Sequence, residues 1–207
     1  MCVRLSFPSG KGEVSVGEGG ASSLECFSSF EYPWLAELLA RFTGGAGWSS
    51  SSIMDALQDS QREVWGILDE RQPLAFCVLH VGPFELEIEM VAVAPEHRRR
   101  GLATQLLRHA QSRVAVLGKE SLLLEVRRSN HAAQRLYEAE GMRQDGVRKG
   151  YYPVLHDDSA TSDEFAHVAS DSLTRDSTAD ASAMSKSATS HGSAREDALL
   201  FSWAPSV

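Results

Sequence analysis

The sequence has few of the features that mark disulfide-rich, metal-binding or membrane proteins. Its 207 residues include three cysteines, Cys2, Cys26 and Cys77, and no two of them lie in a C-x-x-C spacing. An odd number of scattered cysteines favours plain thiols over disulfides or a thiolate site, so we expect no metal. No apolar run approaches the roughly 18 residues of a membrane-spanning helix. The first residues also lack a basic segment followed by an apolar one, which predicts a cytoplasmic protein without a membrane partner.

Basic residues are also in the minority. Twenty Lys and Arg residues stand against 28 Asp and Glu residues, which gives a formal net charge of −8. Because affinity for nucleic acid comes mainly from clustered Lys and Arg, this balance argues against a direct nucleic-acid partner. With 43% apolar and 23% charged residues, the chain can bury one good core. We therefore expect a single domain over residues 1–207.

One segment departs from this globular composition. Residues 157–192 are rich in Ser, Thr, Ala and Asp and hold only isolated apolar residues. Such a segment buries too little surface to offset the entropy of ordering it, which predicts a flexible insertion. Apolar character returns in Ala198-Leu199-Leu200-Phe201, which indicates a last strand. The insertion is therefore expected between the last two strands of the domain.

The rest of the pattern alternates between strands and helices. In the first half, strands are expected at 2–7, 64–69, 73–81 and 86–94, and helical pieces at 23–30 and 34–42. After Pro95 the apolar period changes to about 3.6 residues, which predicts a helix that ends at Gly118. A strand around 122–126, a helix from Asn130 and strands at 147–153 and 197–203 follow. This order predicts an α/β fold with one mixed, mostly antiparallel seven-stranded sheet and helices on both faces.

Candidate chemistry is concentrated where the strand 86–94 meets the following helix. An apolar strand, Val91-Ala92-Val93-Ala94, runs into the basic turn Arg98-Arg99-Arg100-Gly101 and then directly into a helix. Backbone N–H groups at a helix start form an anion site with the helix dipole, and Gly101 and Ala103 let a phosphate approach closely. The chain has no G-x-x-x-x-G-K-[ST] motif and no G-x-G-x-x-G after a first parallel strand, which disfavours nucleoside triphosphates and NAD. Taken alone, however, three arginines before a helix are more often a solvated charge run.

Three blocks in sequence order carry a family resemblance. The string R-x-x-G-x-A at 98–103, preceded by V-A-V-x-P, resembles the acetyl-CoA signature Q/R-x-x-G-x-G/A of the GNAT superfamily of N-acetyltransferases. LEVRRSNHAAQRLYEAEGM at 124–142, and VRKGYYP followed by EDALLF, are similar to the RimI branch, whose enzymes acetylate the N-terminal alanine of a small-subunit ribosomal protein. The resemblance implies a GNAT-like domain, splayed at its acetyl-CoA site, with acetyl-CoA as cosubstrate. The segment 157–192 has no counterpart in that branch.

The resemblance also implies a set of cofactor-binding residues. The backbone of Val91, Ala92 and Val93 is expected to pair with the pantetheine arm of acetyl-CoA, as an added strand would. Asn130 is expected to contact the cofactor, although an Asn before a helix is equally a common N-cap. The turn and the start of the helix are expected to bind the pyrophosphate through Arg98, Arg99, Arg100, Gly101, Leu102, Ala103 and Thr104.

The implied reaction is attack of a neutral amine on a thioester carbonyl, which requires no covalent enzyme intermediate. The resemblance gives Glu125 as proton acceptor and Tyr137 as proton donor to the departing thiolate. From the residues alone, the favoured interpretations are a solvated or paired carboxylate beside Arg127 for Glu125 and a core position for Tyr137. Glu87 and Glu89 are rival bases, because other GNAT branches place a catalytic glutamate on this strand, where alternation puts both on one face.

The acceptor follows from the same resemblance. In RimI-like enzymes a loop and a hairpin with paired tyrosines flank a slot for a peptide N-terminus, which predicts Trp34, Tyr151 and Tyr152 as substrate-binding residues; apolar packing is the alternative for Trp34. We therefore expect a protein N-terminal acetyltransferase that acts on a protein such as a ribosomal protein starting with Ala. A GNAT enzyme for a free small amine or a lysine side chain, and a non-enzymatic acetyl-CoA-binding module, stay open. The insertion lies in that hairpin, so our hypothesis is that it restricts the slot.

Overall fold

The computed structural model describes residues 13–14, 22–27, 35–43, 48–70, 72–153 and 195–205. The sequence-based expectations for residues 2–7, for Trp34 and for the insertion at 157–192 lie outside this part of the chain. In the part that is described, no helix is long and apolar enough to cross a membrane.

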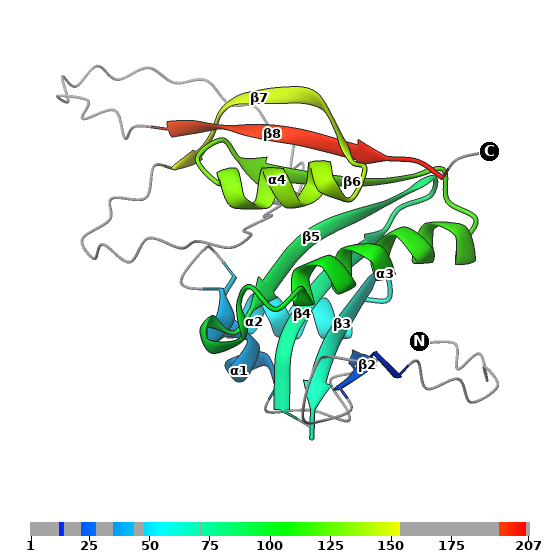
Figure 1. Ribbon diagram of the computed structural model, residues 1–207, viewed down its shortest axis with the longest axis vertical. Coiled ribbons are helices and arrows are strands. Elements are labelled where there is room, and N and C mark those ends of the chain that lie inside the picture. Colours follow the sequence, from blue (N-terminus) through cyan, green and yellow to red (C-terminus); the bar gives the residue numbers. More distant parts are fainter. Residues whose placement is uncertain are drawn as a thin grey trace, which may run out of the picture.

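The described residues form an α/β fold around one mixed sheet (Figure 1). The elements are β1 (Glu13–Val14), β2 (Ser22–Phe27), α1 (Leu35–Phe42), α2 (Ser50–Gln58), β3 (Arg62–Asp69), β4 (Gln72–Val81), β5 (Glu85–Val93), the 3-10 helix η1 (Pro95–His97), α3 (Leu102–Val116), β6 (Ser121–Arg127), α4 (His131–Ala139), β7 (Arg143–Pro153) and β8 (Arg195–Trp203). The strand order is β1-β2-β3-β4-β5-β6-β8-β7, and every neighbouring pair is antiparallel except β5–β6. The predicted mixed, mostly antiparallel sheet is therefore confirmed; six of its strands were predicted, and β1 and β2 were not.

Two local expectations are wrong. Residues 23–30 were expected to be helical, but 22–27 form β2, which pairs with β3 from Ser23 opposite Leu68 to Phe27 opposite Val64. Pairing with the edge of β3 satisfies the backbone groups of both strands and overrides a weak helical preference. Its register also seats the Phe27 ring against Gly66, where a Cβ would lie 2.1 Å from a ring carbon. The tertiary partner of this segment decides its structure.

Helix α2 is the second difference, because the sequence pattern did not single it out. Its N-cap is Ser49, whose side chain accepts a hydrogen bond from Ser52 N at 3.2 Å. Ile53 and Ala56, three residues apart, are its buried positions. The capping serine and this short apolar stripe were present in the sequence, but they lie in and after a run of serines that is typical of a loop.

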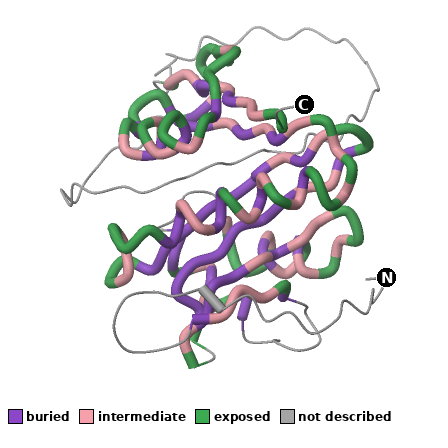
Figure 2. The backbone as a smooth tube through the Cα atoms, turned by 45° about the vertical axis from the view of Figure 1, so that its right-hand side comes forward, coloured by how far each residue is buried: buried purple, intermediate pink, exposed green. Residues whose placement is uncertain are grey.

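Two cores lie on the two faces of the sheet. One contains Leu106 and Ala110 of α3 together with Tyr137 of α4. The other contains Leu39 of α1 and Ile53 of α2. Figure 2 shows the buried residues following the strands between these two helical layers, with exposed residues on the outer sides of the helices. Helices on both faces are therefore confirmed.

The sheet opens between β5 and β6. Their parallel pairing extends only from Glu85 opposite Ser121 to Ile88 opposite Leu124. Beyond it the strands diverge, and Figure 1 shows β6, β8 and β7 leaving the rest of the sheet as a separate arm. A β-bulge in β5 contributes. Leu79 of β4 pairs with Ile88 and its preceding neighbour Val78 pairs with Met90, so Glu89 lies between the two pairs without a partner of its own in β4. A bulge bends its strand, so β5 turns away from β6 where their pairing ends.

Candidate active site

The basic turn after β5 has a backbone conformation that favours glycine. Gly101 is the N-cap of α3 with φ +80°, and Arg99 has φ +62°. Gln105 N donates to Gly101 O at 3.0 Å, so this is the first hydrogen bond of the helix. The amides of the three residues between them, Leu102, Ala103 and Thr104, therefore precede the helical ladder. These amides and the positive end of the helix dipole form the anion site that the sequence predicts.

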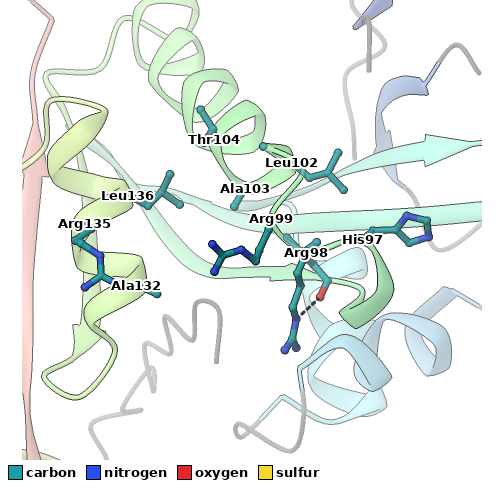
Figure 3. Close-up of a pocket in the computed structure, with 11 residues that line it drawn as sticks. His97, Arg98, Arg99, Leu102, Ala103, Thr104, Ala132, Arg135 and Leu136 are labelled. Atoms are coloured by element: carbon teal, nitrogen blue, oxygen red, sulfur yellow. Dashed lines mark hydrogen bonds between the residues drawn. The ribbon is translucent and has the colours of Figure 1, made fainter. Parts of the chain in front are cut away.

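A pocket of about 370 Å³ lies beside this turn (Figure 3). It is lined by Val93, His97, Arg98, Arg99, Gly101, Leu102, Ala103, Thr104, Ala132, Arg135 and Leu136. The lining carries arginines but no Asp or Glu, which suits a ligand with several negative charges. In Figure 3, Arg99 extends from the turn toward α4, the helix that carries Arg135. Arg98 instead turns back to β5, where its Nε donates to Val93 O at 3.4 Å.

The structure brings together most of the predicted pyrophosphate-binding residues. Of the turn and first helical residues named from the sequence, Arg100 is exposed and does not line the pocket. His97 and the α4 residues Ala132, Arg135 and Leu136 line it but were not predicted. For the α4 residues the sequence carries no signal of its own, because only the tertiary packing of α4 places them opposite α3.

Val91, Ala92 and Val93 lie on β5 beyond its pairing with β6, so no described strand pairs with this side of β5 at these residues, which leaves an open edge in the described sheet. An extended ligand with amide groups fits such an edge as an added strand. Asn130 is buried and caps α4, since its Oδ1 accepts a hydrogen bond from Ala133 N at 3.1 Å. Asn130 does not line the pocket, so the structure supports the capping alternative for this residue.

Glu125 lies on β6 with its side chain 12% exposed. Its Oε1 accepts a hydrogen bond from Nη1 of Arg148 on β7 at 3.0 Å. The other oxygen, Oε2, is buried and has no hydrogen-bond partner among the described residues. The alternative of a paired carboxylate therefore also fits Glu125; its partner is Arg148, because the neighbouring Arg127 donates to Glu196 Oε1 at 2.7 Å. A buried carboxylate oxygen without a partner is unusual and marks a candidate proton acceptor.

Tyr137 lies on α4 and is fully buried, with its ring centroid 5.8 Å from that of Phe201. Its hydroxyl has no hydrogen-bond partner in the described part of the chain. Burial, with a smaller contribution from Tyr152, raises the pKa of this phenol, which therefore stays protonated at neutral pH. A protonated, unpaired hydroxyl is able to act as a proton donor, although the same burial also makes Tyr137 a core residue.

The two rival bases differ in their surroundings. Glu89 is buried and accepts hydrogen bonds on both oxygens from Arg62, at 2.7 and 2.9 Å. This ion pair occupies its carboxylate and makes Glu89 the weaker candidate. Burial, followed by the charges of Glu89, Glu125 and Glu85, raises the pKa of Glu87 to about 7. Glu87 therefore remains a rival to Glu125 on chemical grounds.

The paired tyrosines have different environments. Tyr152 is buried, and the guanidinium of Arg127 lies 4.4 Å from its ring centroid. Tyr151 is half-buried, and the guanidinium of Arg148 lies 4.0 Å from its ring centroid. The two rings contact each other edge to face at 4.8 Å. Tyr152 thus has a packing role in the structure, and Tyr151 is the tyrosine nearer to the surface.

Two curated relatives of the chain share one description. The chain is 32% identical over 126 residues to the ribosomal protein bS18-alanine N-acetyltransferase of Salmonella typhimurium. The aligned region covers 55% of this chain and 85% of that protein. It is 39% identical over 80 residues to the Escherichia coli K12 protein of the same description, which covers 39% of this chain and 54% of that protein.

Solved structures share the fold. The crystal structure of the ribosomal-protein-S18-alanine N-acetyltransferase from Escherichia coli superposes with a TM-score of 0.65 at 22% identity, over 90% of this chain and 95% of that one. A GNAT family acetyltransferase from Elizabethkingia anophelis, solved with acetyl-CoA bound, gives a TM-score of 0.57 at 17% identity, over 89% and 98% of the two chains. At these identities the likeness concerns the fold alone.

A family match agrees with the splayed sheet, the anion-binding turn and these relatives. Residues 26–142, more than half of the chain, match the acetyltransferase (GNAT) family. The protein is therefore an acyltransferase with acetyl-CoA as its cosubstrate. The chain belongs to the acetyltransferase (GNAT) family.

Proposed function

We propose that this enzyme acetylates the N-terminal α-amine of a protein, with a ribosomal protein that starts with Ala as the expected acceptor. The relatives from Salmonella typhimurium and Escherichia coli, at 32% and 39% identity, are described as ribosomal protein bS18-alanine N-acetyltransferases, which supports this acceptor class. A ribosomal acceptor also agrees with the cytoplasmic location that the sequence predicts. The observation that carries the proposal is the Glu125 carboxylate, with one oxygen bound by Arg148 and the other without a partner among the residues that the structure describes.

The pocket residues fit acetyl-CoA, which supplies an activated acetyl thioester. The amides of Leu102, Ala103 and Thr104 and the guanidinium groups of Arg99 and Arg135 would bind its pyrophosphate. The open edge of β5 at 91–93 would accept its pantetheine amides. Both contacts direct the cofactor along the gap where β5 and β6 diverge.

Glu125 and Tyr137 would handle the two proton transfers. An α-amine is largely protonated in water and attacks a thioester only when neutral, so it must first lose a proton. The Oε2 of Glu125, which has no partner among the described residues, is suited to accept it, and the half-buried Glu87 on the neighbouring strand adds negative charge that attracts an ammonium group. The hydroxyl of Tyr137 is suited to protonate the departing thiolate.

A panel of acceptors tests the proposal. The protein is mixed with acetyl-CoA and peptides that begin with Ala, Ser or Met, with polyamines, and with a lysine peptide whose N-terminus is blocked, and thiol release is measured. We expect the highest kcat/KM for the peptides that begin with Ala. Turnover confined to polyamines or to the blocked lysine peptide would contradict the proposal, because those acceptors offer no peptide α-amine.

A further inference from the structure

The pairing of β7 with β8 is interrupted by a bulge that follows Arg148, the residue bound to Glu125. Arg148 pairs with Ala198, and the next pair joins Tyr152 to Glu196. Residues 149–151 of β7 therefore lie opposite the single residue Asp197 of β8. Gly150, at the centre of this bulge, has φ +58°, a conformation that glycine adopts without steric cost.

Side chains of β8 hold this bulge in place. Oδ1 of Asp197 accepts a hydrogen bond from Gly150 N at 2.9 Å, and its Oδ2 forms an ion pair with Nη2 of Arg128 at 3.0 Å. Arg195 donates to Gly150 O at 2.6 Å and also to Tyr151 O. The backbone of the bulge is therefore fixed on both sides, and the conformation that it imposes on Tyr151 is specific rather than a loose loop.

The bulge places Tyr151 over Arg148, and Arg148 in turn contacts Glu125. The Arg148 guanidinium lies 4.0 Å from the Tyr151 ring centroid, within the range of a cation–π contact. Its Nη1 lies 3.0 Å from Oε1 of Glu125. The Arg148 side chain is 46% exposed and that of Glu125 is 12% exposed, so the guanidinium lies nearer to solvent than the carboxylate.

The geometry of this pair differs from that of the other Arg–Glu pairs among the described residues. Three pairs engage both carboxylate oxygens through Nε and a terminal nitrogen of the guanidinium, namely Arg62–Glu89, Arg108–Glu140 and Arg113–Glu63. In Glu196 the two oxygens are shared between Arg127 and the backbone of Ser129. Arg148 binds one oxygen of Glu125 and leaves the other without a described partner.

We propose that Arg148 is a positioning residue, which holds Oε1 of Glu125 so that Oε2 alone stays available to accept the proton of the acceptor amine. This inference rests on the proposed role of Glu125. An ion pair through both oxygens would occupy the base. Without any ion pair, the Glu125 rotamer would be free, and the carboxylates of Glu125 and Glu87 would lack the counter-charge of Arg148. The stacked Tyr151 restricts Arg148 to the one-oxygen geometry.

The charges around Glu125 give Arg148 a measurable second effect. Glu87 and Glu89 face this cluster from β5, and Arg148 and Tyr151 face it from β7. Burial and the neighbouring carboxylates raise the pKa of Glu87 to about 7, and Arg148 opposes this rise. Removing the guanidinium therefore favours retention of the proton by Glu87, so the titration of Glu87 moves to higher pH.

Kinetics of Arg148→Gln and Arg148→Lys test the role. With a peptide that begins with Ala, we expect kcat of Arg148→Gln to fall about tenfold or more, and Arg148→Lys to restore part of this loss. In Arg148→Gln the midpoint of the acidic limb of the kcat/KM pH profile should also move to higher pH, by about half a pH unit or more. The dissociation constant of acetyl-CoA, measured by calorimetry, should stay within about twofold, because Arg148 does not line the pocket. Arg143→Gln is the matched control. Arg143 is exposed on the same strand, and its side chain has no described hydrogen bond or ion pair.

A titration without substrate separates this inference from the proposed function. The side-chain carboxyl carbon of Glu87, whose raised pKa Arg148 opposes, is followed by NMR in labelled protein and assigned with Glu87→Gln. We expect its titration midpoint to move upward in Arg148→Gln and not in Arg143→Gln. An unchanged midpoint with unchanged kcat in Arg148→Gln would overturn the positioning role alone. Full turnover of Glu125→Gln would overturn it differently, by removing the proton acceptor on which it rests.

Discussion

At the scale of single residues, the arrangement depends on two buried oxygen atoms without partners. Oε2 of Glu125 and the hydroxyl of Tyr137 are both buried, and neither has a hydrogen bond within the described residues. Leaving a buried polar atom unpaired costs about 1–3 kcal/mol, so such an atom requires an explanation, and proton transfer supplies one for each of these two side chains.

The proton acceptor is tested by comparing two isosteric changes. We expect Glu125→Gln to lower kcat/KM for a peptide that begins with Ala by about 10²–10⁴, the usual contribution of a general base. Glu87→Gln should retain most of the activity, because Glu87 then contributes charge only. Full turnover in Glu125→Gln together with loss in Glu87→Gln would reverse the assignment.

Tyr137→Phe removes only the unpaired hydroxyl. Because this hydroxyl has no described partner, its loss should leave the melting temperature unchanged or raise it slightly. Activity should fall by about tenfold or more, since the thiolate then departs without a proton donor. Thermal unfolding and steady-state kinetics of the same preparation check both parts. A melting temperature several degrees lower would show that the hydroxyl stabilises the fold instead.

Glu87 makes stability depend on pH. Burial and neighbouring carboxylates raise its pKa from 4.5 to about 7 in the folded protein, so the folded state binds the proton more tightly than the unfolded chain. The stability that Glu87 contributes through its protonated form is fully present below pH 4.5 and is lost as the pH rises through about 7. Glu87→Gln should therefore stabilise the protein at pH 8 and have little effect at pH 4. An equal gain in melting temperature at both pH values would contradict the raised pKa.

At the scale of elements, the start of α3 carries the cofactor site. Gly101 and Gly118 flank this helix with φ of +80° and +62°, and a Cβ on either would meet no atom within 4 Å. Gly101→Ala and Gly118→Ala should each cost about 1–2 kcal/mol of stability, because both force a left-handed conformation on alanine. Calorimetry should show weaker acetyl-CoA binding in Gly101→Ala only. Equal weakening in both variants would place the pyrophosphate elsewhere.

Elements whose apolar period is long and regular were predictable from the sequence. The helix α3 and the strands β3, β4 and β5 were placed within a few residues, because each carries its own pattern. The strand β2 was not, since its structure comes from pairing with β3. The same limit applies to the site, where Gly101 was predicted from the turn but Arg135 was not, because only the packing of α4 places it in the pocket.

At the scale of the whole molecule, function depends on how two parts of the sheet meet. The short β5–β6 pairing and the bulge after Ile88 open the sheet, so the strand with Glu125 and the strand with the open edge face one gap. No local pattern in the sequence encodes this opening, because it depends on which strands pair and where the pairing stops. The family resemblance supplied it, and the bulge in β5 between Ile88 and Met90 gives it a physical basis.

The central claim is that the acceptor nitrogen is the α-amine of a protein. A single peptide that begins with Ala and carries one internal lysine offers both amines at equal concentration to the enzyme with acetyl-CoA. Tandem mass spectrometry of the product identifies which nitrogen carries the acetyl group. We expect the acetyl group on the α-amine, with the lysine unmodified. Acetylation of the lysine with a free α-amine would contradict the proposed function.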